Sequence, residues 1–153
     1  MNQRTVAFDI GGSKIEIARV GSDGAISGRA TRPTPHDSFT SFAAAVASLV
    51  AEAGGADRIG ISIAGTVDPA TGIASAANVP AITGHAIAAE LSERLGVPVR
   101  VGNDADCFAL AEATVGAGRG LPVVFGAIFG TGVGGGLVVN GRLVRGAHGV
   151  TGE

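Results

Sequence analysis

The chain has 153 residues, 46% of them hydrophobic and only 4% aromatic, and its formal net charge is −2. This length suits about one ordinary domain with its own buried core. The longest apolar stretch, residues 121–129, is much shorter than the roughly 18 residues of a membrane helix, and the 11 basic residues are scattered. The composition argues against a membrane partner and a nucleic-acid partner, and it favours a small-molecule partner.

The cellular location and redox state follow from two simple features. Residues 1–5 lead directly into an apolar stretch and show no signal-peptide pattern. Cys107 is the single cysteine, so it cannot form an internal disulfide. Both features favour a cytoplasmic protein. His36, His85 and His148 are too far apart in the sequence to indicate a metal cluster, and we expect them at the surface.

The first third of the chain predicts an antiparallel meander followed by a helix. Three short apolar runs, separated by turn residues, predict the strands: residues 5–10, 15–20 and 25–31. Apolar residues then recur at helical spacing from residue 39 to residue 50. Asp37 or Ser38 is the expected N-cap, and Gly54 and Gly55 end the pattern.

The pattern continues as alternating strands and helices and then starts again. We expect strands at residues 58–64 and 97–101, a loop at 66–72, and helices at 85–95 and 105–115. After a connection at residues 116–120, a second hairpin follows: strands at 123–129, 137–139 and 142–145, with Asn140-Gly141 as the turn. Residues 8–12 and 129–136 are both strand-to-glycine-loop units, which suggests a duplicated fold. We therefore expect one domain at residues 1–118 and the start of a second at 119–153.

The first glycine loop has the chemistry of a phosphate site. Gly11 and Gly12 form a tight bend with exposed backbone amides, and Ser13 and Lys14 add a hydroxyl and an ammonium group. Asp9 stands where a Mg2+ ion bound to phosphates would take an oxygen ligand. The alternative is an ordinary hairpin with a solvated lysine and an aspartate that caps the turn.

The second glycine loop is Gly130, Thr131, Gly132, Val133, Gly134, Gly135 and Gly136. It contains the spacing G-x-G-x-x-G, so a dinucleotide-binding Rossmann protein is the rival interpretation. A Rossmann loop must open a helix, whereas residues 136–142 predict a strand and a tight turn. The chain also has no G-x-x-x-x-G-K-[ST] sequence, which excludes a P-loop protein.

A candidate general base follows the strand predicted at residues 97–101. Asn103 and Asp104 stand where this strand gives way to a helix, so the Asp104 carboxylate can project from the carboxyl edge of the sheet. A kinase needs such a carboxylate within reach of the hydroxyl that it deprotonates. The alternative is that Asp104 is only a helix N-cap. We expect the neighbouring Asp106 to be exposed, and Cys107 to pack as a small apolar residue.

Four segments together resemble the ROK family of bacterial sugar kinases, in the family's order, over essentially the whole chain. They are residues 8–14, 102–105, 130–136 and 146–153. The first and third look like the family's two phosphate loops, the second like its catalytic strand end, and the fourth like the start of its sugar-binding segment. The resemblance implies an α/β fold of the ribonuclease-H-like, actin-like ATPase type, with a mixed five-stranded sheet flanked by helices and the first hairpins of a second, similar lobe.

The same resemblance implies phosphorylation of a sugar 6-hydroxyl by ATP, with Mg2+ as cofactor. Asp104 would take the proton from this hydroxyl, and both glycine loops would hold ATP. The sugar contacts implied by position are Gly65, Asn78, Asn103, Asp104 and Glu153. Residues 76–81 and 103–110 look most like bacterial N-acetylglucosamine kinases, with the family's fructokinases and glucokinases as alternatives.

The sequence departs from the family pattern in two ways. Ser13 replaces the more usual threonine, which keeps the hydroxyl. The sequence ends at Glu153, before the family's next histidine and its cysteine-rich zinc motif, so Zn2+ is expected only in a longer chain. The 153 residues alone are expected to be a poor kinase, and a homodimer is possible for a complete one. A truncated sugar-binding protein without chemistry is the alternative, while a transcriptional repressor of the family is disfavoured because Asp9 follows Met1 too closely for a DNA-binding domain.

Overall fold

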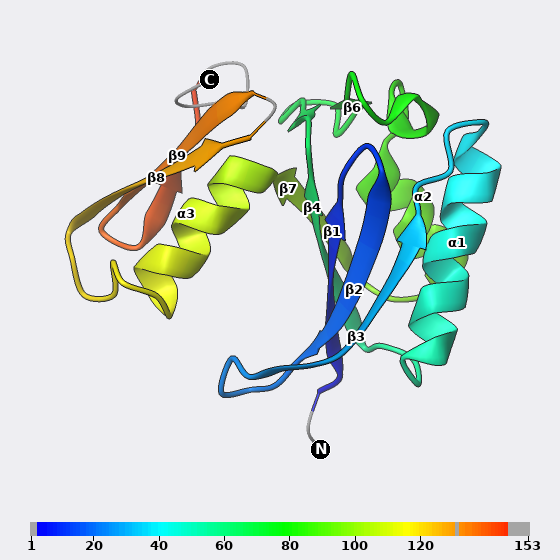
Figure 1. Ribbon diagram of the computed structural model, residues 1–153, viewed down its shortest axis with the longest axis horizontal. Helices are drawn as coiled ribbons and strands as arrows, with labels where there is room; N and C mark the ends of the chain where they lie inside the picture. Colours follow the sequence, from blue (N-terminus) through cyan, green and yellow to red (C-terminus); the bar gives the residue numbers. More distant parts are fainter. Residues whose placement is uncertain (1–2, 131, 147–153) are drawn as a thin grey trace. The chain divides into compact units, whose positions relative to one another are not determined.

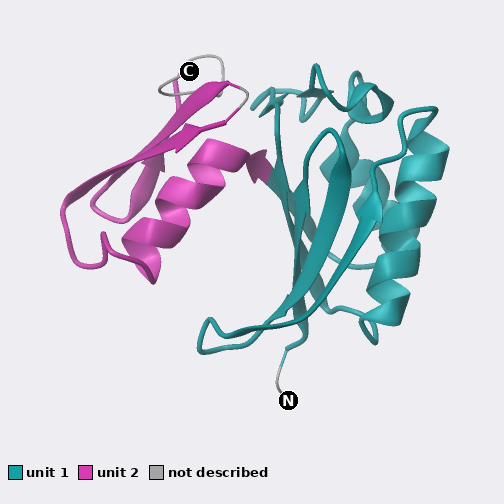
Figure 2. Ribbon diagram, viewed as in Figure 1, with its two compact units in different colours: residues 1–101 teal, residues 102–153 magenta. Residues whose placement is uncertain are grey.

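The computed structural model describes residues 3–130 and 132–146, and the chain forms two compact units, residues 1–101 and residues 102–153 (Figure 2). The helix after the first unit, α3 (Asp104–Thr114), packs on two strands of the second unit. The compact units therefore divide before this helix, whereas the predicted domain boundary lies after it. The assignment of residues 1–118 and 119–153 as domains stays a prediction.

A mixed five-stranded sheet with the order β3-β2-β1-β4-β7 organises the first unit (Figure 1). Its strands are β1 (Thr5–Ile10), β2 (Lys14–Val20), β3 (Ile26–Pro33), β4 (Arg58–Ile63) and β7 (Val99–Asn103). The first three strands pair antiparallel, and β4 adds to β1 in parallel. The predicted meander and the predicted mixed sheet are confirmed.

Two helices cover one face of this sheet, α1 (Phe39–Glu52) and α2 (Ile87–Leu95) (Figure 1). The Ser38 hydroxyl accepts a hydrogen bond from the Ser41 amide at 3.1 Å, so Ser38 is the N-cap of α1. Gly96 ends α2 in the left-handed conformation, with φ of 69°. These local signals explain why the sequence predicts both helices within two residues of their observed ends.

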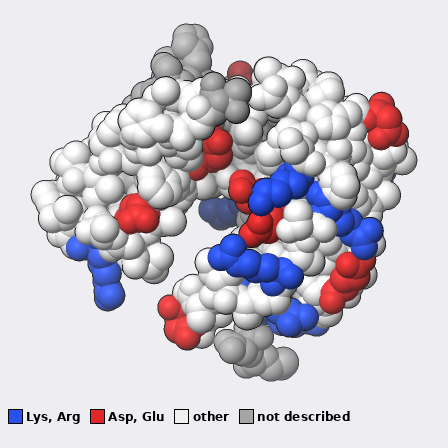
Figure 3. All heavy atoms as spheres, viewed as in Figure 1, with Lys and Arg blue, Asp and Glu red and all other residues white. Residues whose placement is uncertain are grey.

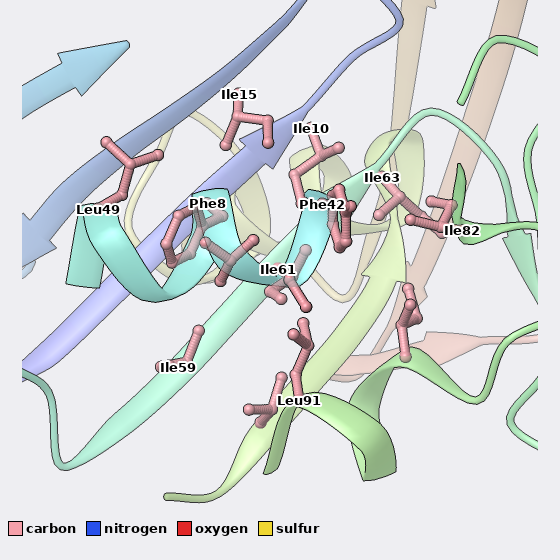
Figure 4. Packing of buried hydrophobic residues seen from close by; sticks show 14 of the residues in the cluster. Phe8, Ile10, Ile15, Phe42, Leu49, Ile59, Ile61, Ile63, Ile82 and Leu91 are labelled. Atoms are coloured by element: carbon pink, nitrogen blue, oxygen red, sulfur yellow. The ribbon is translucent and has the colours of Figure 1, made fainter. Parts of the chain in front are cut away.

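The core of the first unit lies between the sheet and these helices (Figure 4). Alternate residues of each central strand point toward the helices, as the two-residue period of a strand requires. The buried side chains from the strands and helices include Phe8, Ile10, Ile15, Phe42, Leu49, Ile61, Ile63 and Leu91. Full burial of one such side chain stabilises the fold by about 1.5–3 kcal/mol, so this layer fixes the register of the strands that carry the glycine loop.

The predicted loop at residues 66–72 is partly wrong. Two short strands, β5 (Thr66–Val67) and β6 (Ala74–Ser75), form a small antiparallel hairpin. The Asp68 carboxylate accepts hydrogen bonds from the amides of Ala70 and Thr71 and so closes the turn between them. A 3-10 helix, η1 (Pro80–Ile82), follows, which the sequence does not predict. Elements of two or three residues are too short to show a periodic pattern.

The second unit contains α3 and an antiparallel sheet with the order β10-β9-β8. The strands are β8 (Val123–Phe129), β9 (Val133–Val139) and β10 (Arg142–Val144). Asn140 and Gly141 both have positive φ, 48° and 73°, which confirms the predicted Asn-Gly turn. β9 begins four residues earlier than predicted, so Gly134, Gly135 and Gly136 lie in a strand. Within residues 3–130 and 132–146, no helix is long and apolar enough to cross a membrane.

Candidate functional site

The first glycine loop leaves the carboxyl edge of the sheet next to the turn after β4. β1 and β4 run parallel with Ile10 beside Ile63, and the Ala64 amide donates to the Ile10 carbonyl at 3.2 Å. The bend at Gly11 and the turn at Gly65 therefore start from the same edge. In open α/β sheets ligands bind at this edge. Both segments contain residues that were predicted from the sequence to bind a ligand.

The loop itself is a tight bend whose carbonyl groups are already bound. The Gly11 amide donates to the Lys14 carbonyl at 3.0 Å and closes the turn. The Thr34 hydroxyl donates to the Gly11 carbonyl at 2.7 Å, and the His36 Nε2 lies 2.7 Å from the Gly12 carbonyl. Within the described residues, the Gly12 amide donates no hydrogen bond. The bend thus keeps a backbone donor for an anion.

No role of Thr34 was expected from the sequence, and His36 was expected only to lie at the surface. The structure confirms that His36 is exposed but gives its ring a backbone partner. Thr34 is 6% exposed, and its amide also donates to the Ser13 carbonyl at 3.1 Å. One feature of the sequence could have indicated this role. Two prolines, Pro33 and Pro35, stand on either side of the hydrogen-bonding Thr34, and such a pattern is typical of a rigid extended connection.

Charged side chains next to the loop form a small network. The Lys14 Nζ lies 3.2 Å from one oxygen of Glu16, and Arg29 lies 3.0 Å from the other. The hydrogen bond and charge of Lys14, followed by those of Arg29, hold the pKa of the Glu16 carboxyl below its ordinary value. Asp9 is exposed and faces Glu16 across the β1–β2 ladder. An exposed carboxylate and an ammonium beside free backbone amides suit a phosphate with its cation.

Lys and Arg side chains gather on one part of the face shown in Figure 3, with Asp and Glu side chains among them. The described ion pairs of the first unit include Arg4 with Asp57 and Arg32 with Glu52. Because such exposed pairs are screened, each contributes little to stability.

A segment proposed to contact sugar lies directly against the first glycine loop. An ideal Cβ at Gly12 would stand 2.9 Å from the Asn78 Cβ and 3.0 Å from the Asn78 carbonyl oxygen. Real Cβ atoms do not approach so closely, so only glycine fits at this position. Asn78 itself is exposed. The structure therefore brings together a candidate phosphate loop and a candidate sugar ligand within one unit.

Close packing also requires glycine at position 65. A Cβ there would lie 2.5 Å from the Ser75 carbonyl oxygen and 2.8 Å from the Ala76 Cβ. The Gly65 amide donates to the Ile63 carbonyl at 2.9 Å. The turn after β4 is thus held against the segment that leads to Asn78.

In the second unit, Asn103 and Asp104 begin α3. Asn103 is 6% exposed, and its side-chain oxygen accepts a hydrogen bond from the Asp106 amide at 3.1 Å. Asn103 is therefore the N-cap, and the alternative that Asp104 caps the helix is wrong. Asp104 is the first helical residue and half-buried, and its Oδ1 accepts from the Ala105 amide at 2.9 Å. A carboxylate at this position is also favoured by the helix dipole.

The expected exposure of Asp106 is wrong, because this residue is only 4% exposed. It occupies the first turn of α3 on the same side as Ala105 and Ala109, which are also buried. The sequence places two aspartates in one turn but does not show which of them turns inward. Asp104 is thus the more accessible of the two carboxylates.

The second glycine loop joins two strands. The Gly130 amide donates to the Gly132 carbonyl at 2.9 Å, and β9 follows directly at Val133. Because a strand rather than a helix follows, the rival Rossmann interpretation is wrong. Thr131 and Glu153, two of the predicted ligands, lie outside the described residues.

Close packing against α3 requires glycine at position 136, which was not expected from the sequence. A Cβ there would lie 2.5 Å from the Ala105 carbonyl oxygen and 2.9 Å from the Ala109 Cβ. Gly126 is its partner across the ladder, and a Cβ built there would lie 3.0 Å from the same Ala109 Cβ. These two glycines let α3 approach the hairpin closely. Nucleotide contacts by Gly134, Gly135 and Gly136 remain predictions.

Comparison with known proteins gives the chain its relatives. A model of the ROK family matches residues 5–153. The N-acetyl-D-glucosamine kinase of Salmonella paratyphi C (strain RKS4594) is 46% identical over an alignment of 150 residues that covers 95% of this chain and 50% of that protein. The chain thus spans about half the length of the curated relatives it matches.

Solved structures agree with this comparison. A ROK family glucokinase from Streptomyces griseus, in complex with glucose and AMPPNP, has a TM-score of 0.86 and 33% identity, over 98% of this chain and 49% of that one. The ROK hexokinase from Thermus thermophilus has the same TM-score and identity, over 98% of this chain and 51% of that one.

Proposed function

The chain belongs to the ROK family, and on this basis we propose that it supplies the phosphate loops and the general base of an ATP-dependent sugar kinase. The contact of Gly12 with Asn78 is the observation that carries the proposal. A bend with free backbone donors thus lies next to Asn78, whose exposed side chain carries an amide that suits sugar hydroxyls. Phosphoryl transfer to a sugar needs its two substrates side by side in this way.

The first loop binds and orients the phosphates in this proposal. Backbone amides of Gly12 and Ser13 donate to phosphate oxygens, while Lys14 adds positive charge. Asp9, which is exposed at the end of β1, holds the cation through its carboxylate. A bound Mg2+ ion would neutralise negative charge on the phosphates and favour their in-line arrangement. In the second loop, the Gly130 amide closes the turn onto the Gly132 carbonyl, and the Gly132 amide offers a further backbone donor to the nucleotide.

Asp104 acts as the general base in the transfer step. Its carboxylate takes the proton of the sugar 6-hydroxyl as the bond from this oxygen to the γ-phosphorus forms and the bond from phosphorus to the ADP oxygen breaks. Since Asn103 already caps the helix, the Asp104 carboxylate is not needed as the cap. Asn103, Asn78 and Gly65 are the proposed contacts of the sugar.

N-acetylglucosamine is the sugar that we favour. The relatives at 46% identity are N-acetyl-D-glucosamine kinases, whereas the glucokinase and the hexokinase with solved structures are 33% identical. Turnover of N-acetylglucosamine, N-acetylmannosamine, glucose and fructose by the full encoded chain tests this preference. Preferential turnover of glucose or fructose would show that the sugar assignment is wrong.

Replacement of Asp104 by asparagine tests the base assignment. We expect Asp104→Asn in the full encoded chain to lower kcat by roughly 10²–10⁴-fold, because general-base catalysis contributes about this factor. The Kd for the sugar should change little, because asparagine keeps the size and the hydrogen-bonding oxygen. Asp23→Asn is the matched control, since this exposed aspartate only accepts from the Ala25 amide in a turn. Retained turnover in Asp104→Asn would refute the assignment, and sugar binding without turnover in the unaltered chain would favour a non-catalytic sugar-binding protein.

A further inference from the structure

We propose that residues 33–38, which connect β3 to α1 and are called the β3–α1 segment below, position the amides of the first glycine loop through Thr34 and His36. The inference rests on the proposed function, because it concerns how the same loop binds phosphate. Neither residue touches phosphate in this proposal. Each acts on a backbone carbonyl and thereby fixes the direction of the next amide.

Because the peptide bond is planar, the direction of each carbonyl also sets the direction of the next amide. In a trans peptide the carbonyl of one residue and the amide of the next lie in one plane and point in opposite directions. The described peptide bonds are all trans. When Thr34 binds the Gly11 carbonyl and His36 binds the Gly12 carbonyl, the amides of Gly12 and Ser13 must point away from these two side chains. Two successive donors are thus fixed on the side of the loop opposite to the β3–α1 segment.

Ordinary pairing of β2 with β3 explains only one of the three contacts that Thr34 and His36 make with the loop. The bond from the Thr34 amide to the Ser13 carbonyl, at 3.1 Å, extends the antiparallel ladder of β2 and β3, in which Lys14 faces Pro33. The bonds of the Thr34 hydroxyl and the His36 ring are side-chain bonds outside this ladder. They reach the loop from 23 and 24 residues away in the sequence.

The β3–α1 segment is itself held rigidly. Pro33 and Pro35 fix φ on both sides of Thr34 and favour extended backbone before them. Thr34 is 6% exposed, so its hydroxyl bond is shielded from water and costly to lose. Two residues after His36, Ser38 caps α1, whose Phe42 and Leu49 are buried in the core. The imidazole is therefore presented from a fixed support.

The test measures the loop directly and nucleotide binding separately, in the full encoded chain. We expect His36→Leu and Thr34→Val to lower the ¹H–¹⁵N heteronuclear NOE of Gly12 and Ser13, because each variant removes one carbonyl partner. The Kd for MgADP should rise about fivefold, the ordinary effect of one hydrogen bond. His36→Gln and Thr34→Ser keep a donor at each position and should restore both values.

His85→Leu is the matched control. It removes another partly exposed imidazole, whose ring centroid lies 4.2 Å from that of Phe39 and whose Nδ1 lies 3.2 Å from the Glu90 carboxylate. An unchanged NOE at Gly12 and Ser13 in both His36→Leu and Thr34→Val would overturn the inference, and so would an equal loss in His85→Leu. If the unaltered chain does not bind MgADP, the proposed kinase function fails, whereas the NOE comparison still decides whether Thr34 and His36 position the loop.

Discussion

Replacement of Gly12 by alanine perturbs the first glycine loop and the backbone at Asn78 at the same time. The added Cβ would lie 2.9 Å from the Asn78 Cβ and 3.0 Å from the Asn78 carbonyl oxygen, so the two segments must separate by several tenths of an ångström. Overpacking of this kind costs about 1–3 kcal/mol of unfolding free energy. Because a misplacement of about 1 Å can reduce a rate on the order of 10²-fold, kcat/KM for phosphorylation should fall by roughly ten- to a hundredfold.

The assay is sugar-dependent ADP release by the full encoded chain, together with its thermal unfolding. Gly60→Ala is the matched control, because Gly60 lies in the same sheet and a Cβ there meets no atom within 4 Å in the part of the chain that the structure describes. We expect this control to keep both activity and stability. A Gly12→Ala variant with the activity and the unfolding temperature of the unaltered chain would refute the reasoning, since it would mean that the loop and Asn78 are not held in contact.

Two further predictions concern stability. Gly136→Ala should lower the unfolding free energy of the second unit by about 1–3 kcal/mol, because its Cβ would lie 2.5 Å from the Ala105 carbonyl oxygen. Urea denaturation checks this beside the control Gly132→Ala, where a Cβ meets no atom of the described residues within 4 Å. Equal denaturation midpoints for the two variants would contradict the packing role. Glu16 should make stability fall in acid, because its folded pKa lies below its ordinary value of 4.5: its contribution is complete above this value and is lost as the pH falls through the folded pKa. The unfolding temperature of Glu16→Gln should therefore lie below that of the unaltered chain at pH 7 and approach it at pH 3, and a difference that does not depend on pH would refute the coupling to Lys14.

The elements that sequence predicts well are those with local causes. α1 begins after Ser38 because the hydroxyl of this residue binds an amide three residues later, and α2 ends at Gly96 because glycine accepts the left-handed conformation. The Asn140-Gly141 turn follows from the same conformational rule. In each case the interacting atoms lie within a few residues of one another.

The features that sequence does not predict have long-range causes. Thr34 and His36 meet the first glycine loop only after β3 has paired with β2. The inward turn of Asp106 and the close approach of Gly136 to α3 depend on how the helix packs on the hairpin. A glycine-rich spacing therefore marks a loop but does not distinguish a residue that binds a ligand from one that admits a helix.

The features of the candidate site also differ in whether their causes are local or long-range. The first glycine loop and the start of α3 are visible as short motifs, because a tight bend and a helix N-terminus each need particular residues at neighbouring positions. The contact of Gly12 with Asn78 joins residues 66 positions apart, and no local pattern predicts it. Its physical origin is the turn after β4, where Gly65 packs closely on Ser75 and Ala76.

The most direct test of the central claim is the incubation of the full encoded chain with N-acetylglucosamine and MgATP, with the product identified by ³¹P and ¹³C NMR. The account predicts release of ADP that depends on the sugar, and a phosphate ester on the 6-oxygen. No sugar-dependent ADP release with any of the four sugars named above, or a phosphate on another oxygen of N-acetylglucosamine, would contradict it.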